Sequence, residues 1–161
     1  MCKKRIIDDF TGDYRFLSNF YQCPFDYKGL TYPNSEAAFQ AQKCATEEDK
    51  IKYTTTKNPV VAKRMGKKEP GFPSNWDDIW YGIMKDILIA KFSVPELREK
   101  LKATGDATLI EGNHWHDNRW GKCTCEKCQS KEAQNWLGKI LMEIRDTLRW
   151  KIGRNMKAYE G

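Results

Sequence analysis

The sequence predicts an α+β fold that is dominated by helices and carries a small β-sheet or hairpin. Several long stretches place apolar residues at helical spacing, a few short stretches are typical of strands, and the sequence has no internal repeat. At 161 residues and 18.8 kDa, the chain is long enough for one domain with its own core. We therefore expect a single domain over residues 1–161, with its core at about 5–150 and a C-terminal tail at 151–161.

The first expected elements are short strands. Residues 5–9 favour a strand, and residues 24–27 with 30–32 favour a hairpin around Lys28 and Gly29. A later strand is expected at 107–111.

The other elements are expected to be helices, and turn or capping residues mark where they begin. Asn34, Asn58 with Pro59, and Ser74 or Asn75 are suitable starts. The expected helices cover about residues 34–43, 47–53, 58–66, 75–92, 95–104 and 134–150. Two of them carry apolar stripes that we interpret as core, namely Ile79, Ile83, Ile87 and Ala90 in one and Leu137, Ile140, Leu141, Ile144 and Leu148 in the other.

The composition favours a water-soluble protein with an anionic partner. The net charge is +6, and a basic run gathers Lys57, Lys63, Arg64, Lys67 and Lys68. Such a run is compatible with a nucleotide, with a polynucleotide or with solvation alone. The N-terminus lacks the apolar stretch of a secretory signal, and no window of about 20 apolar residues exists. We expect a cytoplasmic location, no membrane association and reduced cysteines.

The stretch YPNSEAAFQAQK, residues 32–43, is the strongest indication of a site. On a helix, Glu36, Gln40 and Lys43 stand at i, i+4 and i+7 and therefore project from one side. The alanines between them let a neighbouring element pack closely. A solvated polar stripe beside an alanine core stripe is the alternative.

Four further sequence blocks flank this stretch. FLSNFY at 16–21 precedes it, and LIEGN at 109–113, DNRWG at 117–121 and NWLGKILMEIR at 135–145 follow it. The order resembles that of the NADAR (YbiA-type) family over about residues 16–145. The resemblance implies an N-glycosyl hydrolase with a NADAR-like fold and no cofactor. Its substrate would be ADP-ribosylated guanine, in nucleic acid or as a nucleotide, or a phosphorylated riboflavin-biosynthesis intermediate. A non-catalytic module that binds NAD or ADP-ribose is the alternative.

The resemblance also implies catalytic roles for Lys43, Glu36 and Asp117. Lys43 matches the lysine of the family motif and would attack the sugar carbon to give a Schiff base, while a carboxylate stabilises the positive charge. In the alternative mechanism, a water oriented by Glu36 or Asp117 attacks directly.

The remaining blocks supply candidate substrate-binding residues. These are Asn19, Phe20, Tyr21, Gln40, Asn113, Trp120, Gly121, Asn135 and Gly138. Structural roles remain open for several of them, because Asn19, Asn113 and Asp117 are suited to turns and Trp120 to a core. The amides at the start of the last helix could hold a phosphate.

The segment CTCEKC departs from the family pattern, as does Ala133, where relatives often have glycine. Cys123, Cys125 and Cys128 could bind zinc with His116 or His114, or could form a reduced, exposed loop. A small zinc-containing nucleic-acid binder is thus a third functional class. We expect a monomer, and the biological partner could be an ADP-ribosyltransferase toxin whose action the protein reverses.

Overall fold

The computed structural model describes the backbone of residues 3–159 and the side chains of residues 3–149. The described chain forms two compact units, one made of residues 19–97 and the other of residues 3–18 with 98–159. The expectation of a single domain stays a prediction, and residues 160–161 of the expected tail lie outside the described residues.

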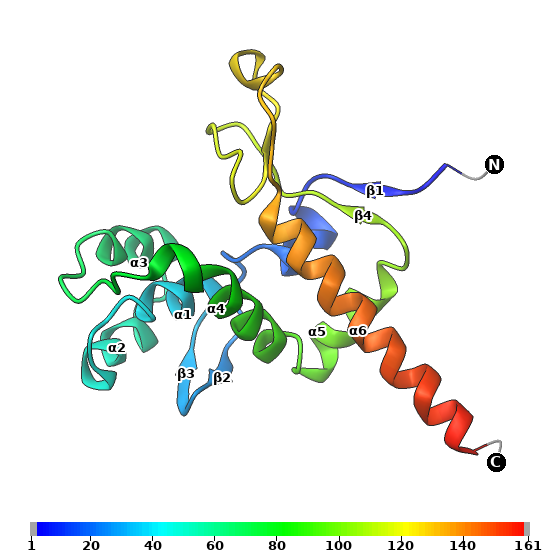
Figure 1. Ribbon diagram of the computed structural model, residues 1–161, viewed down its shortest axis with the longest axis horizontal. Helices are drawn as coiled ribbons and strands as arrows, with labels where there is room; N and C mark the ends of the chain where they lie inside the picture. The colour runs from blue at the N-terminus through cyan, green and yellow to red at the C-terminus, as the bar shows by residue number, and fades with distance from the viewer. Residues whose placement is uncertain (1–2, 160–161) are drawn as a thin grey trace. The chain divides into compact units, whose positions relative to one another are not determined.

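The 19–97 unit contains a hairpin and four helices. Strands β2 (Phe25–Tyr27) and β3 (Leu30–Tyr32) pair antiparallel with Phe25 opposite Tyr32, as expected. The helices are α1 (Ser35–Ala41), α2 (Glu47–Thr54), α3 (Pro59–Gly66) and α4 (Trp76–Lys91). Helix α1 packs against the other three (Figure 1). Every one of its residues is buried.

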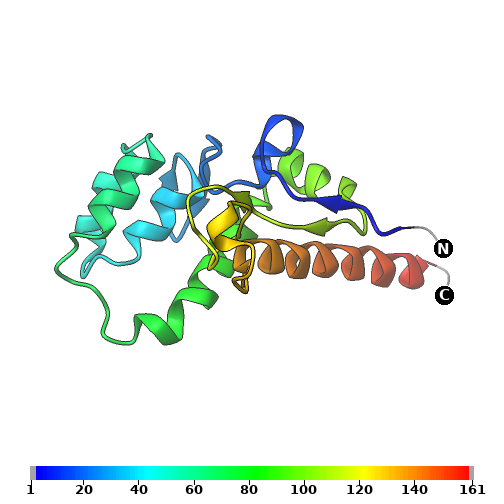
Figure 2. The ribbon, with the colours of Figure 1, turned by 90° about the horizontal axis from the view of Figure 1, so that it is seen from above.

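The second unit is built around the long helix α6 (Trp136–Tyr159). Strand β1 (Ile6–Ile7) pairs in parallel with β4 (Thr108–Leu109), and Figures 1 and 2 show this pair running beside α6. A second parallel pair joins β5 (Gly112–Asn113) to β6 (Lys122–Cys123). The unit also contains the 3-10 helices η1 (Gly12–Leu17) and η2 (Glu126–Cys128), and α5 (Pro95–Ala103) crosses the boundary between the units in sequence.

The α+β, helix-dominated fold class is confirmed, and so are two of the expected helix starts. The Asn34 side chain accepts a hydrogen bond from the Ala37 amide at 2.8 Å, and that of Asn58 accepts from the Val60 amide at 3.0 Å. Asn75 precedes α4 but makes no side-chain capping bond. The caps are readable from sequence because they depend on neighbouring residues alone.

Three expectations about helices are wrong in detail. Helix α1 ends at Ala41, so Lys43 lies beyond it in a turn. The last helix continues past residue 150 to Tyr159, where a tail was expected. In α4 the buried residues are Trp76, Met84, Ile87, Leu88 and Lys91, so of the predicted stripe only Ile87 is fully buried. The predicted stripe held apolar residues alone, whereas the buried face of α4 also contains the charged Lys91.

The strands are shorter than expected, with two residues each in β1 and β4, and the pair β5 and β6 was not anticipated. Two-residue strands carry too little periodicity to be read from sequence. The core stripe of α6 is largely confirmed, since Leu137, Ile140, Leu141 and Ile144 are buried. Among the described residues, no helix has both the length and the apolar character needed to cross a membrane.

Candidate active site

Asn19 fastens the beginning of α1. Its backbone carbonyl accepts a hydrogen bond from the Glu36 amide at 3.1 Å, and its Oδ1 accepts one from the Ser35 hydroxyl at 2.9 Å. Its Nδ2 lies 3.8 Å from the Met84 sulfur of α4. Asn19 is therefore engaged within its unit and fixes the position from which Glu36 projects.

Glu36 and Gln40 form a buried pair one turn apart on α1. Gln40 Nε2 donates to Glu36 Oε1 at 2.9 Å, and the two residues are only 7% and 4% exposed. A buried carboxylate needs such donors, because an unsolvated charge is costly. Gly66 of α3 permits the approach, since a methyl group there would lie 1.9 Å from Gln40 Oε1. The prediction that these two side chains share one side of the helix is confirmed.

Lys43 follows α1 and is half-buried rather than directed into bulk water. The Lys43 amide donates to the Gln40 carbonyl at 3.1 Å, which continues the chain as a tight turn. Its Nζ lies 5.4 Å from the ring centres of both Phe72 and Trp76. Aromatic faces attract a cation, so these rings hold the amine end at a defined place.

The rings around Lys43 belong to an aromatic cluster that the sequence analysis missed. Trp76 lies 5.2 Å from Phe39 and 5.3 Å from Phe72, measured between ring centres. Phe72 is 47% exposed, whereas Trp76 and Phe39 are buried. Phe72 lies in the loop between α3 and α4, where the sequence analysis predicted no element and named no site residue.

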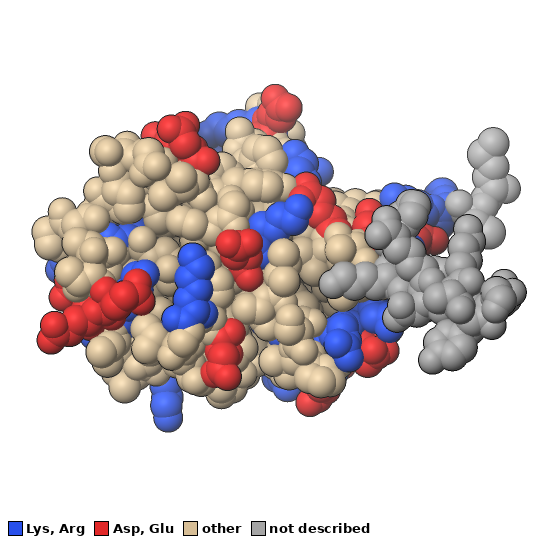
Figure 3. Space-filling model, turned by 60° about the horizontal axis from the view of Figure 1, so that its bottom comes forward, with Lys and Arg blue, Asp and Glu red and all other residues tan. Residues whose placement is uncertain are grey.

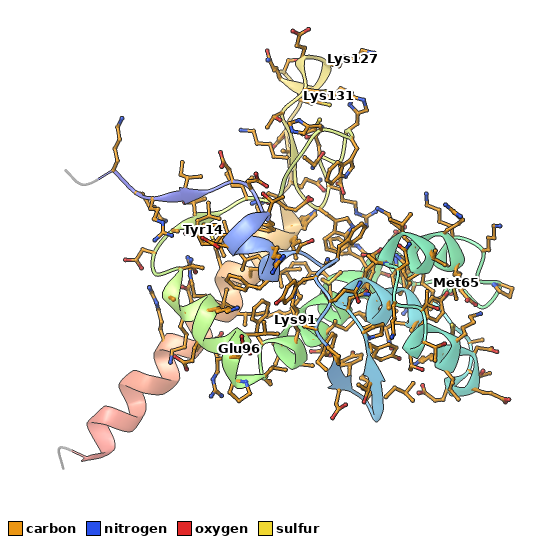
Figure 4. All side chains as sticks on the ribbon, turned by 180° about the vertical axis from the view of Figure 1, so that it is seen from behind. Tyr14, Met65, Lys91, Glu96, Lys127 and Lys131 are labelled. Carbon is orange, nitrogen blue, oxygen red and sulfur yellow. The ribbon has the colours of Figure 1, made fainter. Side chains whose placement is uncertain are left out.

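A buried lysine is the second feature that the sequence did not reveal. Lys91 of α4 is fully buried, with Nζ 5.9 Å from the Tyr21 ring centre and 5.2 Å from that of Phe92 (Figure 4). Burial lowers the pKa of Lys91 to about 8, because a low-dielectric interior disfavours the ammonium, while neighbouring Cys23 opposes this shift. Phe20, beside Tyr21, is 42% exposed, and its contact with a ligand stays a prediction.

In the other unit, Asn113 closes the loop that carries Asp117. Asn113 is 2% exposed, its Nδ2 donates to the Asp117 carbonyl at 2.7 Å, and its Oδ1 accepts from the Asp117 amide at 3.2 Å. The turn-forming role that the sequence left open for Asn113 is therefore the one observed. Its contact with a ribose stays a prediction.

The Asp117 carboxylate organises the DNRWG turn. Its Oδ1 accepts from the Arg119 amide at 3.0 Å and from the Trp120 amide at 2.8 Å. Trp120 is half-buried, so it is neither a core residue nor a free surface ring. Gly121 lies against Glu111, and a methyl group at Gly121 would stand 2.0 Å from the Glu111 carbonyl oxygen. A side chain at 121 would push the turn away from β5.

Asn135 ties the start of α6 to the end of β4. Its Oδ1 accepts from the Glu111 amide at 3.0 Å, and its Nδ2 donates to the Leu109 carbonyl at 2.9 Å. Gly138 also lies against the Leu109 carbonyl. Both residues thus have structural contacts, and their predicted contact with substrate remains untested.

The expectation that the start of α6 offers its amides to a phosphate is wrong. The Trp136 amide donates to the Arg119 carbonyl at 3.1 Å, and the Leu137 amide donates to the Trp120 carbonyl at 3.0 Å. The DNRWG turn thus occupies the donors that an anion would need. A sequence pattern that identifies a helix start cannot say which loop folds onto it.

The cysteine segment forms a compact group of possible metal ligands. The side chains of His116, Cys123, Cys125 and Cys128 converge, with one ligand atom from each lying within 4.8 Å of the others. The second imidazole considered from sequence, His114, instead lies with its Nδ1 3.1 Å from the Thr124 hydroxyl.

A surface cavity of about 700 Å³ lies elsewhere in the same unit. Basic residues such as Lys4, Arg5 and Arg145 line it together with Asp106 and Asp146. None of the residues predicted for substrate or catalysis belongs to its lining, so we do not assign the active site to it.

The model of the NADAR domain matches residues 8–149, which include α1, the DNRWG turn and most of α6. The chain belongs to the NADAR domain family.

Several named relatives are similar over most of this chain. This chain is 36% identical over 144 residues to the N-glycosidase YbiA of Escherichia coli (strain K12). The aligned region covers 86% of this chain and 84% of that protein. The N-glycosidase Npun_R5314 of Nostoc punctiforme is 29% identical, with 84% and 86% covered. The riboflavin biosynthesis protein VVA0006 of Vibrio vulnificus is 32% identical over 89% of this chain but only 38% of its own length.

The fold agrees with that of a solved structure. The NMR structure of Escherichia coli YbiA superposes with a TM-score of 0.76 at 33% identity, covering 93% of this chain and 89% of that one. Together with the names of its relatives, this similarity makes the chain an enzyme of the N-glycosidase class.

Proposed function

We propose that this NADAR protein hydrolyses the bond between a base nitrogen and a phosphorylated or ADP-linked ribose, with Lys43 and Glu36 as catalytic residues. The observation that supports it is the arrangement in the 19–97 unit: a buried, hydrogen-bonded carboxylate on α1 is followed by a lysine held against an aromatic cluster. A planar base needs a ring to stack on, and a departing base needs charge stabilisation at the sugar.

Lys43 is the proposed nucleophile. Its uncharged amine forms a bond to the anomeric carbon while the carbon–nitrogen bond to the base breaks, and the base leaves with that electron pair and takes up a proton. Loss of the amine proton and opening of the ribose ring give a Schiff base. Water then adds to the same carbon, which releases the ribose and restores the amine. The aromatic rings stabilise the ammonium form of Lys43, which cannot act as a nucleophile. The amine must therefore lose a proton before it attacks.

Glu36 is proposed to stabilise the positive charge that develops on the anomeric carbon. Its burial strengthens that interaction, because fewer water molecules screen it. Gln40 orients the carboxylate through its 2.9 Å hydrogen bond. Direct attack by a water that Glu36 or Asp117 orients is the alternative chemistry, and it needs no covalent step.

Phe72 is proposed to bind the base, together with the exposed Phe20, while the buried Trp76 supports Phe72 from within the cluster. Phe72 presents nearly half of its surface to solvent, so a second ring can stack on it without displacing the core. In the other unit, Asp117 and Trp120 are proposed to contact substrate from the DNRWG turn. This proposed role does not depend on the role of Lys43, and substitutions of Asp117 and Trp120 would test it separately.

The preferred substrate is ADP-ribosylated guanine, as a nucleotide or within nucleic acid, which would allow the protein to reverse a modification made by an ADP-ribosyltransferase. The positive net charge supports an anionic substrate. On the face drawn in Figure 3, however, basic and acidic side chains are interspersed, so a small phosphorylated molecule also fits. A cytoplasmic monomer remains our prediction.

A phosphorylated riboflavin precursor is the second candidate. The name of the Vibrio vulnificus relative favours it, since that protein is described as acting in riboflavin biosynthesis. Both substrates join a base-like nitrogen to a phosphorylated ribose, so one site chemistry serves either.

The experiment is incubation of the protein with ADP-ribosylated guanosine and, in parallel, with the riboflavin precursors, followed by chromatography of the released base and ribose phosphate. We expect release by the native protein and none by Lys43→Ala. Lys102→Ala, which removes an ammonium paired with Glu99 on α5, is the matched control and should keep full activity. Binding of either compound without any release would instead favour the non-catalytic module.

A further inference from the structure

The segment between β5 and α6 reaches away from the start of α6 as a narrow arm (Figure 1). Lys127 and Lys131 lie at its tip (Figure 4). Of residues 122–132, all of which the structure describes, only Cys123 and Cys128 are buried. An ordered segment must offset its lost conformational entropy, and two thiols supply little apolar area for that purpose. We therefore expect a further interaction, such as a cross-link between side chains, to stabilise the ordered arm.

The two buried thiols face a third thiol and an imidazole. The Nδ1 atom of His116 lies 3.3 Å from the Cys125 sulfur and 3.4 Å from the Cys128 sulfur. Including Cys123, the four ligand atoms lie within 4.8 Å of one another. In a tetrahedral zinc site with ordinary bond lengths, nitrogen and sulfur ligands are about 3.6 Å apart and two sulfurs about 3.8 Å apart. The observed spacing thus needs only small side-chain adjustments to surround one ion.

Backbone hydrogen bonds hold the ligands in place. The Cys123 amide donates to Asn118 Oδ1 at 2.9 Å, and the Cys128 amide donates to the Cys125 carbonyl at 3.0 Å within η2. The amides of Cys125 and His116 also lie within hydrogen-bonding reach of the Cys123 sulfur. Donors of this kind stabilise thiolate ligands and are a regular part of metal sites.

We propose that His116, Cys123, Cys125 and Cys128 bind one zinc ion. Three sulfur ligands and one imidazole in a tetrahedral set suit Zn²⁺ rather than Mg²⁺ or Ca²⁺, which prefer oxygen. The thiols lose their protons to solvent as the ion binds, while His116 binds as a neutral imidazole. Because the protein supplies all four ligands, the ion has no open position for a substrate, and its role is structural.

The ion would also steady the DNRWG turn. His116 immediately precedes Asp117, and Asn118 accepts the hydrogen bond from the Cys123 amide. Fixing His116 and Cys123 to one ion closes the loop on both sides of Asp117. This zinc site does not depend on the proposed substrate or on Lys43.

The test is zinc analysis of the full-length protein, purified under reducing conditions without added metal. We expect about one zinc per chain in the native protein and in His114→Ala, and its loss in His116→Ala and Cys128→Ser. Cys44→Ser, which removes a buried thiol of the other unit, should retain the ion. The two histidine variants form the matched pair, since only one of these imidazoles belongs to the group.

Cobalt(II) titration of the native apoprotein gives a second readout that does not depend on the folding of any variant. Tetrahedral sulfur ligation should produce strong visible absorption that saturates at one equivalent and is displaced by zinc. A native protein with negligible zinc and no such absorption would overturn the proposal. So would zinc that survives in His116→Ala but is lost in His114→Ala, or a pair of these cysteines found joined as a disulfide.

Discussion

Gln40 donates a 2.9 Å hydrogen bond to the Glu36 carboxylate inside a helix whose residues are all buried. Helix α1 thus holds the Glu36 carboxylate in a fixed, buried position. The arrangement explains why alanines surround Glu36, since larger side chains would hold α2, α3 and α4 away from it. The roles of Glu36 in catalysis and in stability can therefore be measured separately, with a substitution that keeps the shape of the side chain.

Glu36→Gln should reduce kcat by at least about 10²-fold with little change in the melting temperature, because the neutral amide keeps the shape but not the charge. Steady-state kinetics and thermal unfolding of the same preparation measure both. Glu47→Gln, on the exposed start of α2, is the control. Full activity in Glu36→Gln would remove this residue from the mechanism.

Asn34→Ala should lower the free energy of unfolding by about 2 kcal/mol, since it removes the α1 cap and the 3.0 Å bond to the Lys57 carbonyl. Thr46→Ala removes the exposed cap of α2 and should cost about 0.5 kcal/mol. Denaturant unfolding compares the two. Equal costs would mean that burial of α1 adds nothing to its cap.

Gly121→Ala should destabilise the protein by about 1–3 kcal/mol, because its methyl group would stand 2.0 Å from the Glu111 carbonyl oxygen. Gly82→Ala is the matched glycine variant. Gly82 lies in exposed α4 surface with nothing near its missing side chain, so alanine there should stabilise by up to about 1 kcal/mol. A harmless Gly121→Ala would show that the turn can move away from β5.

Lys91 should make stability rise with pH between about 8 and 10.5. Below pH 8 the lysine is charged in both the folded and the unfolded state, and the cost of its burial is fully present. Between its folded pKa of about 8 and its ordinary value, the folded protein has lost the proton that the unfolded chain still binds, so the free energy of unfolding increases.

The measurement is the difference in unfolding free energy between Lys91→Met and its parent across pH 7 to 11. A Cys23→Ser background removes the neighbouring thiol, whose own pKa is raised by burial. As pH rises, the free energy of unfolding of the parent protein should increase relative to that of Lys91→Met. A difference that does not vary with pH would mean that the folded Lys91 keeps its proton.

The sequence predicted what depends on near neighbours. The caps at Asn34 and Asn58, the hairpin at Lys28 and Gly29, and the pairing of Glu36 with Gln40 all follow from spacing over a few residues. The order of the blocks identified the family because it samples the whole chain at once.

What the sequence did not predict depends on residues that are distant along the chain. The Phe72 and Trp76 rings meet Lys43 only after the chain has passed through α2 and α3. The carbonyls that occupy the start of α6 come from a turn at Arg119 and Trp120. The burial of Lys91 was not predicted, because only apolar residues were assigned to the core stripe of its helix.

Trapping of the Schiff base decides whether Lys43 is the nucleophile. Native protein is incubated with the substrate that it cleaves in the presence of borohydride, digested, and mapped by mass spectrometry. The account predicts a substrate-dependent ribose adduct on Lys43 and loss of the adduct in Lys43→Ala. Turnover without any adduct, or an adduct on another lysine such as Lys91, would contradict it.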